Sequence, residues 1–261
     1  MELSDSEFEQ YQTEGYLVVE DALDTAMVDR VKTRLREYTH GDRTPEGFER
    51  QLEPRVERGE LEVEEEGDAV RKFEGLGMVE TDDVFREVAN DDTIVSVAAQ
   101  LLGENLKLLR SAAMFKPPEV GSEKGYHQDA AYYPIQPMDH LTVWIALDEA
   151  TTENGCMNVV PGGHKDGLLG HEAVEYDTDI VIAEKDYDAE DAVPIPMEPG
   201  SVLFTHCLVP HYTAPNTTEN WRRALINSYM RSRSRFTKPD EELPPWVDSV
   251  HIQGEEFPGC V

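Results

Sequence analysis

The sequence predicts an α+β chain in which helices come first and a mainly β unit, a sandwich or a barrel, follows. Up to about residue 105 the apolar residues recur mostly at helical spacing, and from about residue 106 short β-like runs alternate with turn signals. The 261 residues contain no internal repeat and no Gly-Ser linker. We therefore expect a single domain over residues 1–261, with a helical part over about 1–105, a β core over about 106–235 and a C-terminal tail.

The first two helices are predicted from their ends. Ser4 followed by Glu7 matches a capping box, and Gly15 is expected to end this helix. A short strand is expected over residues 16–19. The second helix has Thr25 as its expected N-cap, and its apolar face consists of Val28, Val31 and Leu35.

Residues 40–68 contain few apolar side chains and include the run ELEVEEEGD. Because blocks of like charge repel and stay hydrated, this stretch predicts a solvated loop. The next helix is expected to be capped by Asp92 or Thr93 and to end at Gly103.

The β core is predicted from its short apolar runs, and this spacing is typical of an all-β sandwich or barrel. The acidic stretch 172–193 is expected to be a long insertion between strands. Strands are expected over residues 106–115, 141–147, 157–160, 180–183, 202–204 and 221–230.

The charge of the chain excludes some partners and says little about chemistry. With 54 Asp and Glu against 23 Lys and Arg, the net charge is −31, which opposes binding to nucleic acids and anionic membranes. Only eight of the cations are lysines, and a carboxylate-rich, lysine-poor surface predicts a halophilic source, where salt screens the repulsion.

The location is predicted from what the sequence lacks. It contains no run of 18 apolar residues and no apolar N-terminal leader, so we expect neither membrane insertion nor secretion. Three scattered cysteines predict no disulfide framework and no CxxC zinc site. A reducing cytoplasm is the expected location, and the sequence sets no oligomeric state.

The segment GYHQDA at residues 125–130 carries the first sign of chemistry. His127 and Asp129 are two residues apart, so on a strand both side chains would point to one face. An imidazole and a carboxylate on one face supply two ligands of a 2-His-1-carboxylate site for Fe(II).

The third ligand is expected far along the chain, and His211 is the favoured candidate. His211 and Thr213 would share one face of a strand, and after a turn the chain returns with Arg222. A guanidinium there can hold a carboxylate, which suits a co-substrate such as 2-oxoglutarate that chelates the metal through its other end. His206 is the closest rival, and the remaining downstream candidates are His140, His164, His171 and His251.

These motifs together resemble the phytanoyl-CoA dioxygenase family. The resemblance rests on HQD at 127–129, VWIALDEATTENGC at 143–156, PGGH at 161–164, His211 with Arg222 eleven residues later, and the opening GYLVVE at 15–20. It implies a double-stranded β-helix, which is a cupin-like jelly roll, with flanking N-terminal helices. It also implies Fe(II), 2-oxoglutarate and O2 as the cofactor and co-substrates, and a small-molecule substrate.

The resemblance assigns roles position by position. His127, Asp129 and His211 match the iron ligands, and Arg222 matches the partner of the distal 2-oxoglutarate carboxylate. The same comparison places three side chains in the co-substrate pocket, namely Thr213, Trp144 and Lys72, and makes Gln128 a further pocket candidate. A pocket position that is commonly Met falls on Ala112. The neighbouring Tyr126, Tyr132 and Tyr133 are candidates for a substrate pocket or for packing.

The predicted function is therefore an Fe(II)- and 2-oxoglutarate-dependent hydroxylase that releases succinate and CO2. Related halogenases replace the metal-binding carboxylate with a small residue, so Asp129 favours hydroxylation. Two alternatives remain open on the sequence: a non-catalytic protein that binds 2-oxoglutarate and metal, and a cupin-like metalloenzyme that does not use 2-oxoglutarate. The sequence does not identify the substrate.

Overall fold

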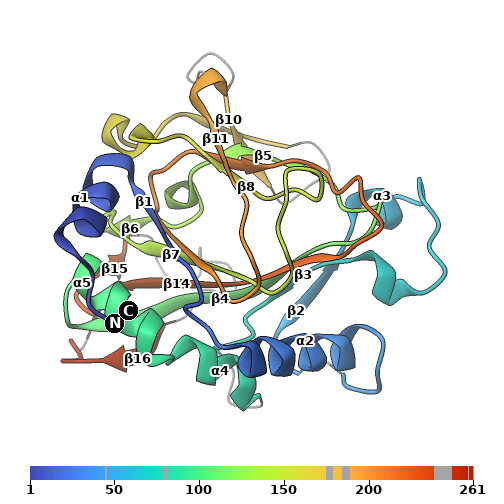
Figure 1. The fold of residues 1–261 in the computed structure, drawn as a ribbon, viewed down its shortest axis with the longest axis horizontal. Coiled ribbons are helices and arrows are strands. Elements are labelled where there is room, and N and C mark those ends of the chain that lie inside the picture. Colours follow the sequence, from blue (N-terminus) through green and yellow to red (C-terminus); the bar gives the residue numbers. More distant parts are fainter. Residues whose placement is uncertain are drawn as a thin grey trace.

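The core of the protein is a large antiparallel sheet, seen in a computed structural model that describes residues 1–44, 46–78, 82–174, 179–183, 189–237, 249–257 and 259–260 (Figure 1). Its strands run in the order β1-β12-β7-β14-β4-β3-β2, and β16 also pairs with β4. The bounds are β1 Tyr16–Val19, β2 Glu49–Leu52, β3 Val70–Glu74, β4 Leu106–Lys116, β7 Leu141–Ala146, β12 Val202–His206, β14 Arg222–Arg231 and β16 Val250–Gln253.

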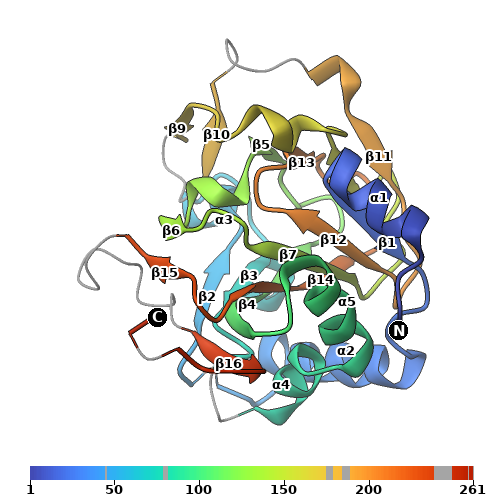
Figure 2. The same cartoon turned by 90° about the vertical axis from the view of Figure 1, so that its left-hand side faces the viewer.

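A smaller sheet faces the large one, with the order β11-β8-β13-β5. Figure 2 shows this sheet above the large sheet and the helices α2, α4 and α5 below it. Its strands are β5 Lys124–His127, β8 Met157–Val159, β11 Val193–Ile195 and β13 His211–Thr213. Two facing antiparallel sheets with helices outside confirm the predicted α+β jelly roll.

Two short two-stranded sheets complete the sheets of the described residues. They pair β9 His171–Ala173 with β10 Ile180–Ile182, and β6 Ile135–Gln136 with β15 Arg235–Phe236. The helices are α1 Asp5–Glu14, α2 Thr25–Thr39, α3 Pro54–Glu57, α4 Asp83–Ala89 and α5 Asp92–Leu102, with 3₁₀ turns η1 Glu66–Ala69, η2 Asp129–Ala131, η3 Gly163–Asp166 and η5 Ala189–Asp191.

Strand alternation divides the core into two apolar layers. Val143 and Ile145 of β7 pack in the same cluster as residues of the outer helices, such as Val31 of α2. Trp144 and Ala146, the alternate residues of the same strand, belong to the cluster between the two sheets. The inward face of the large sheet therefore contributes side chains to the interior of the jelly roll.

The helix ends agree in part with the sequence. The Ser4–Glu7 capping box is present, and Gly15 ends α1 in the left-handed conformation, with φ of 82°. The expected cap Thr25 was wrong, because the Asp24 carboxylate accepts the N–H of Met27 and Thr25 is the first helical residue. The expected caps Asp92 and Thr93 were also wrong, because Asp91 occupies that position in α5.

Two acidic segments are more structured than expected. The predicted loop over 40–68 contains β2 and α3, and its Glu53 is buried. The predicted insertion over 172–193 contributes β10 and the end of β9, and reaches β11 of the small sheet. The local charge of the first segment predicted a loop. This prediction failed for β2, because its residues pair with β3, a contact that the local composition does not encode.

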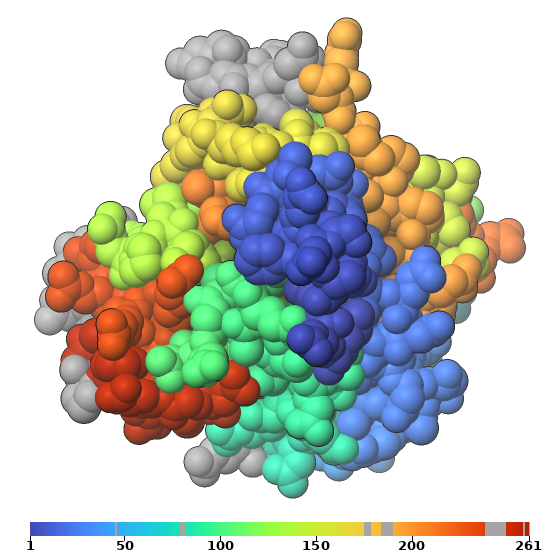
Figure 3. Space-filling model, turned by 60° about the vertical axis from the view of Figure 1, so that its left-hand side comes forward, coloured from blue at the N-terminus to red at the C-terminus, as the bar shows by residue number. Residues whose placement is uncertain are grey.

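Helix α1 lies on the outside of the jelly roll. In Figure 3 it crosses the surface in dark blue, between the yellow segment that contains η3 and the green segment that contains α5. The N–H of Gly162 donates to the carbonyl of Glu14, and the N–H of Leu3 donates to Gln100. Among the described residues, no helix combines the length and apolar character needed to cross a bilayer.

Candidate metal and co-substrate site

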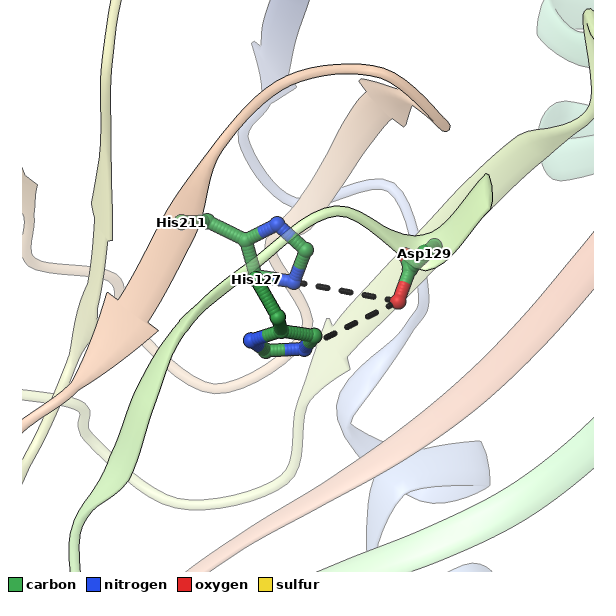
Figure 4. A group of neighbouring side chains, drawn as sticks. All are labelled: His127, Asp129 and His211. Carbon is green, nitrogen blue, oxygen red and sulfur yellow. Dashed lines mark ion pairs between the residues drawn. The ribbon is translucent and has the colours of Figure 1, made fainter. Parts of the chain in front are cut away.

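Strand pairing brings the two predicted histidine ligands together. In the small sheet, His127 of β5 lies directly opposite His211 of β13. Figure 4 shows the two imidazoles and the carboxylate of Asp129 converging on one point. Asp129 reaches this point differently from our expectation: β5 ends at His127, and Asp129 begins the turn η2 rather than continuing a strand.

Hydrogen bonds orient both imidazoles. Nδ1 of His127 lies 2.9 Å from the carbonyl oxygen of Gly125, and Nδ1 of His211 lies 2.9 Å from that of Val209. A proton on each Nδ1 would satisfy these carbonyls and leave each Nε2 with a lone pair. The Nε2 atoms of His127 and His211 lie 3.9 Å and 3.8 Å from Oδ1 of Asp129.

The protonation states also suit a metal site. Burial lowers the pKa of His127 well below its usual range, and the neighbouring His211 lowers it further. Burial raises the pKa of Asp129, but the adjacent histidines and the Thr142 hydroxyl outweigh it and bring the pKa well below its usual range. At neutral pH, His127 is therefore a neutral donor and Asp129 a charged one.

Within the described residues, His127, Asp129 and His211 form the cluster whose ligand atoms could hold one metal ion. All three side chains are buried. Two imidazole nitrogens and one carboxylate oxygen on one side of a point match the donor set of a non-haem Fe(II) site with open positions. The residues present thus fit the implied iron.

Thr142 supports this cluster and was not predicted from the sequence. Its hydroxyl donates to Oδ2 of Asp129 over 2.6 Å, from strand β7 of the large sheet. This bond leaves Oδ1 facing the histidines, so Thr142 is a positioning residue for the carboxylate.

Arg222 lies in the same cavity as the three ligands. It is 3% exposed, and its Nε has no hydrogen-bond partner in the part of the chain that the structure describes. Its guanidinium lies over the ring of Trp144, 5.6 Å from the centroid. Burial lowers the pKa of Arg222 to about 10, so the group remains charged at neutral pH. A buried cation with an unsatisfied donor fits a bound carboxylate, as 2-oxoglutarate would supply.

The other predicted co-substrate residues line the same cavity. Thr213 follows His211 on β13, and Trp144 lies on the inward face of β7. Lys72 of β3 also lines the cavity, with Nζ 3.3 Å from a carboxylate oxygen of Glu74. The structure therefore gathers these three side chains around one cavity with the ligand cluster and Arg222.

Lys116 also lines this cavity and was not predicted from the sequence. It lies opposite Arg222 in the pairing of β4 with β14, and it is 4% exposed. Burial lowers the pKa of Lys116 to about 6, and nearby Arg222 lowers it as well. At neutral pH Lys116 is therefore mostly uncharged beside the charged Arg222, and its Nζ donates to the carbonyl of Ser122.

A profile of the family described as phytanoyl-CoA dioxygenase matches residues 11–224 of this chain. The chain belongs to the phytanoyl-CoA dioxygenase family. The resemblance drawn from the motifs is confirmed. A phytanoyl-CoA dioxygenase domain-containing protein 1 from Danio rerio is 28% identical over 282 residues, which cover 93% of this chain and 97% of the relative.

Solved structures share the fold of this family member. The non-heme monooxygenase ThoJ, in its apo form, superposes with a TM-score of 0.72 at 22% identity, covering 95% of this chain and 84% of ThoJ. The epimerase SnoN, solved in complex with Fe3+, alpha ketoglutarate and nogalamycin RO, gives a TM-score of 0.68 at 21% identity, covering 97% and 96% of the two chains.

The structure places two positions suggested by the family resemblance outside the cavity lining. Gln128 does not line the cavity: its amide donates to the carbonyls of Gly167 and Leu208, and its side-chain oxygen accepts the N–H of Leu169. Its role is to tie the end of β5 to these loops. Ala112 is fully buried outside the cavity lining, and Met114, two residues further along β4, lines the cavity instead.

The other histidine candidates lie apart from the ligand cluster. His206, the closest rival of His211, stacks on His164 and accepts the N–H of Leu208. His171 accepts the N–H of Gln128 through Nε2, and His140 stacks on Tyr133. His251 lies near Glu256 at the chain's C-terminal part.

Proposed function

We propose that this family member is an Fe(II)- and 2-oxoglutarate-dependent dioxygenase that hydroxylates an unactivated C–H bond of a small organic substrate, with release of succinate and CO2. One observation carries the proposal: the His127–Asp129–His211 cluster shares a cavity with a buried Arg222 whose Nε has no described partner. The family and the SnoN structure with Fe3+ and alpha ketoglutarate support it.

One set of residues binds the metal, and another binds the co-substrate. Nε2 of His127, Nε2 of His211 and the Asp129 carboxylate hold the iron, and Thr142 fixes the carboxylate. Arg222 binds the distal carboxylate of 2-oxoglutarate, with the hydroxyl of Thr213 and the side-chain nitrogen of Lys116 beside it. When bound, iron and 2-oxoglutarate supply the activation of O2 for hydroxylation. Asp129 keeps a carboxylate at the position that a halide would need, which favours hydroxylation.

The test is 2-oxoglutarate turnover in the presence of Fe(II), measured as O2 consumed and succinate formed. Arg222→Gln should raise the 2-oxoglutarate KM by about 100-fold, because it removes a buried charge-assisted bidentate contact. Arg223→Gln is the matched control on the same strand, since Arg223 pairs with Asp148 and does not line the cavity.

Two results would favour one of the alternative functions over the proposed one. Normal activity of Arg222→Gln would support a cupin-like metalloenzyme that does not use 2-oxoglutarate. Tight 2-oxoglutarate binding without succinate, across a panel of substrates, would support a non-catalytic binding protein.

We further infer that residues 1–261 work as a single domain in a reducing, salt-rich cytoplasm, without a nucleic-acid partner. The three cysteines are free, which supports a reducing compartment. The net charge of −31 supports both a halophilic source and the exclusion of nucleic acids. Fractionation of the source cells, followed by immunodetection, tests the location.

A further inference from the structure

We propose that Lys116 is a second basic group that holds the distal carboxylate of 2-oxoglutarate, and that it takes up one proton as this co-substrate binds. This inference rests on the proposed function, because it concerns the co-substrate of that same site. It starts from strand pairing: β4 and β14 run side by side, and Lys116 at the end of β4 lies directly opposite Arg222 at the start of β14 (Figure 1). Directly opposite residues of an antiparallel pair are neighbours on one face, and both side chains line the cavity.

Packing and hydrogen bonds hold the Lys116 side chain in this place. It is 4% exposed, and its Nζ donates to the carbonyl of Ser122, another residue of the cavity lining. A Cβ added at Gly155 would lie 2.8 Å from Cδ of Lys116, so the backbone there passes close to the aliphatic part of the lysine. The backbone carbonyl of Lys116 accepts the side-chain amide of Asn216. The amine is therefore held inside the cavity, on the strand next to that of Arg222.

Two basic groups buried side by side disfavour each other's charge. A guanidinium is much harder to deprotonate than an ammonium, so Arg222 keeps its charge and the lysine loses its proton. The lowered pKa of Lys116, about 6 through burial and then through Arg222, agrees with this order. Three further charged groups act on the amine: Glu53, just before α3, raises its pKa, and Arg71 of β3 and Lys124 of β5 lower it.

A carboxylate bound to Arg222 reverses this balance. It places a negative charge beside the amine, which favours the protonated form of Lys116. An ammonium has three donors, so one N–H can bond to the carboxylate while another stays on the Ser122 carbonyl. The nitrogen forms one new N–H bond with a proton from the solvent, and no bond of the protein breaks. Lys116 thus changes from a neutral amine to a charged partner of the co-substrate.

The test is calorimetric titration of 2-oxoglutarate into the anaerobic, Fe(II)-loaded protein at pH 7, in buffers of different ionisation enthalpy. The slope of the measured heat against the ionisation enthalpy of the buffer gives the number of protons taken up. We expect about 0.9 proton, because an amine with a pKa of about 6 is mostly neutral at pH 7 and becomes charged in the complex. Because binding takes up a proton, the affinity should also weaken as the pH rises from about 7 to about 8.

Oxalate separates the contribution of the distal carboxylate from that of the metal. It can chelate iron through two oxygens but is too short to place a carboxylate at Arg222. Its binding should therefore take up no proton at Lys116. An equal uptake with oxalate would assign the proton to another group and overturn the inference.

Variants assign the proton to one side chain. Lys116→Met should bind 2-oxoglutarate about tenfold more weakly at pH 7 and without proton uptake. Lys165→Met is the matched control, because it changes an exposed lysine outside the cavity lining, and it should keep the wild-type affinity and proton number. Glu53→Gln removes the other titratable group that acts on the amine from before α3, and should keep the uptake.

Binding of 2-oxoglutarate to the wild type without proton uptake would overturn the inference, as would uptake that persists in Lys116→Met or disappears in Glu53→Gln. The wild-type proton number and the oxalate comparison need no variant, so a folding defect cannot hide the result. If 2-oxoglutarate failed to bind the Fe(II)-loaded wild type at all, the proposed function would fail instead.

Discussion

Asp129 shows how one residue depends on contacts from several strands. One carboxylate oxygen faces the two imidazoles, and the other accepts the Thr142 hydroxyl at 2.6 Å. The carboxylate can rotate about the bond that joins it to the rest of the side chain. The Thr142 hydroxyl restricts this rotation and so keeps the other oxygen facing the imidazoles.

Thr142→Val keeps the shape of this side chain and removes the hydroxyl. We expect Fe(II) affinity to fall about 10- to 100-fold, as for other residues that orient a metal ligand. An anaerobic competition titration against a metal indicator measures the change. Thr142→Ser retains the hydroxyl and should bind Fe(II) nearly as the wild type does; equal affinity of all three proteins would contradict the role of Thr142.

Lys116 shows the stability cost of burying a titratable side chain in the site cavity. Burial lowers its pKa to about 6 from 10.5, so between these two values the unfolded chain binds a proton that the native protein does not. Stability therefore rises with pH across this window, and the buried lysine destabilises the fold most at its acidic end.

Lys116→Met should accordingly raise the free energy of unfolding at pH 7 by about 1–3 kcal/mol, a range that allows for the lost hydrogen bond to Ser122. The gain should shrink as the pH approaches 10, and 2-oxoglutarate affinity should fall. Urea denaturation at several pH values, with calorimetry of 2-oxoglutarate binding, checks both. A gain that does not vary with pH would show that the lysine is charged in the native protein.

The residues closest to the chemistry were predictable from the sequence, and their supports were not. His127, Asp129 and Arg222 belong to motifs with fixed spacing, which local sequence reveals. Thr142 and Lys116 owe their positions to strand pairing, and neither has a sequence signature. Gln128 lies between two ligands in sequence, yet the end of β5 turns its amide toward backbone groups of other loops.

At the scale of elements, β3 and β4 form a charged wall of the cavity. Lys72 and Glu74 lie on β3, and Arg110 lies on β4. Glu74 is 1% exposed and is the carboxylate that both cations contact. The strand pair therefore depends on one buried acid for its electrostatic balance.

Glu74→Gln should destabilise the protein by about 3–5 kcal/mol, because it leaves Arg110 and Lys72 buried without a counter-charge. Glu87→Gln is the control: it breaks an ion pair with Arg30 in which both side chains are about half exposed, and should cost less than about 1 kcal/mol. Denaturant midpoints of the two variants give the comparison. Similar small losses in both would mean that water reaches Glu74.

Elements with local signals were predicted well, and elements defined by long-range pairing were not. The capping box of α1 and the apolar run of β7 are encoded in neighbouring residues. The strands β2 and β3 were missed, because their sequences, ERQL and VRKFE, are charged and form strands through pairing with each other and with β4.

At the scale of the whole molecule, the net negative charge does not describe the surroundings of the site. The excess carboxylates give the net charge of −31, whereas three of the eight lysines line the site cavity. Basic side chains gathered in this cavity can attract an anionic co-substrate over a short range inside a molecule of net negative charge.

The salt dependence of stability tests the origin of this charge. We expect the melting temperature to rise as KCl increases from about 0.1 M to about 2 M, because screening weakens repulsion among surface carboxylates. The rise should be smaller at an acidic pH at which these carboxylates begin to protonate. Equal stability at low and molar KCl would argue against a halophilic source.

The most direct test of the site is the visible spectrum of the anaerobic protein with Fe(II) and 2-oxoglutarate. The account predicts a weak, saturable metal-to-ligand charge-transfer band in the wild type. His206→Ala should retain the band, because His206 lies outside the ligand cluster, and His211→Ala should lose it together with tight iron binding. A wild-type protein that holds iron yet shows no band with 2-oxoglutarate, or a band that survives His211→Ala, would contradict the assignment.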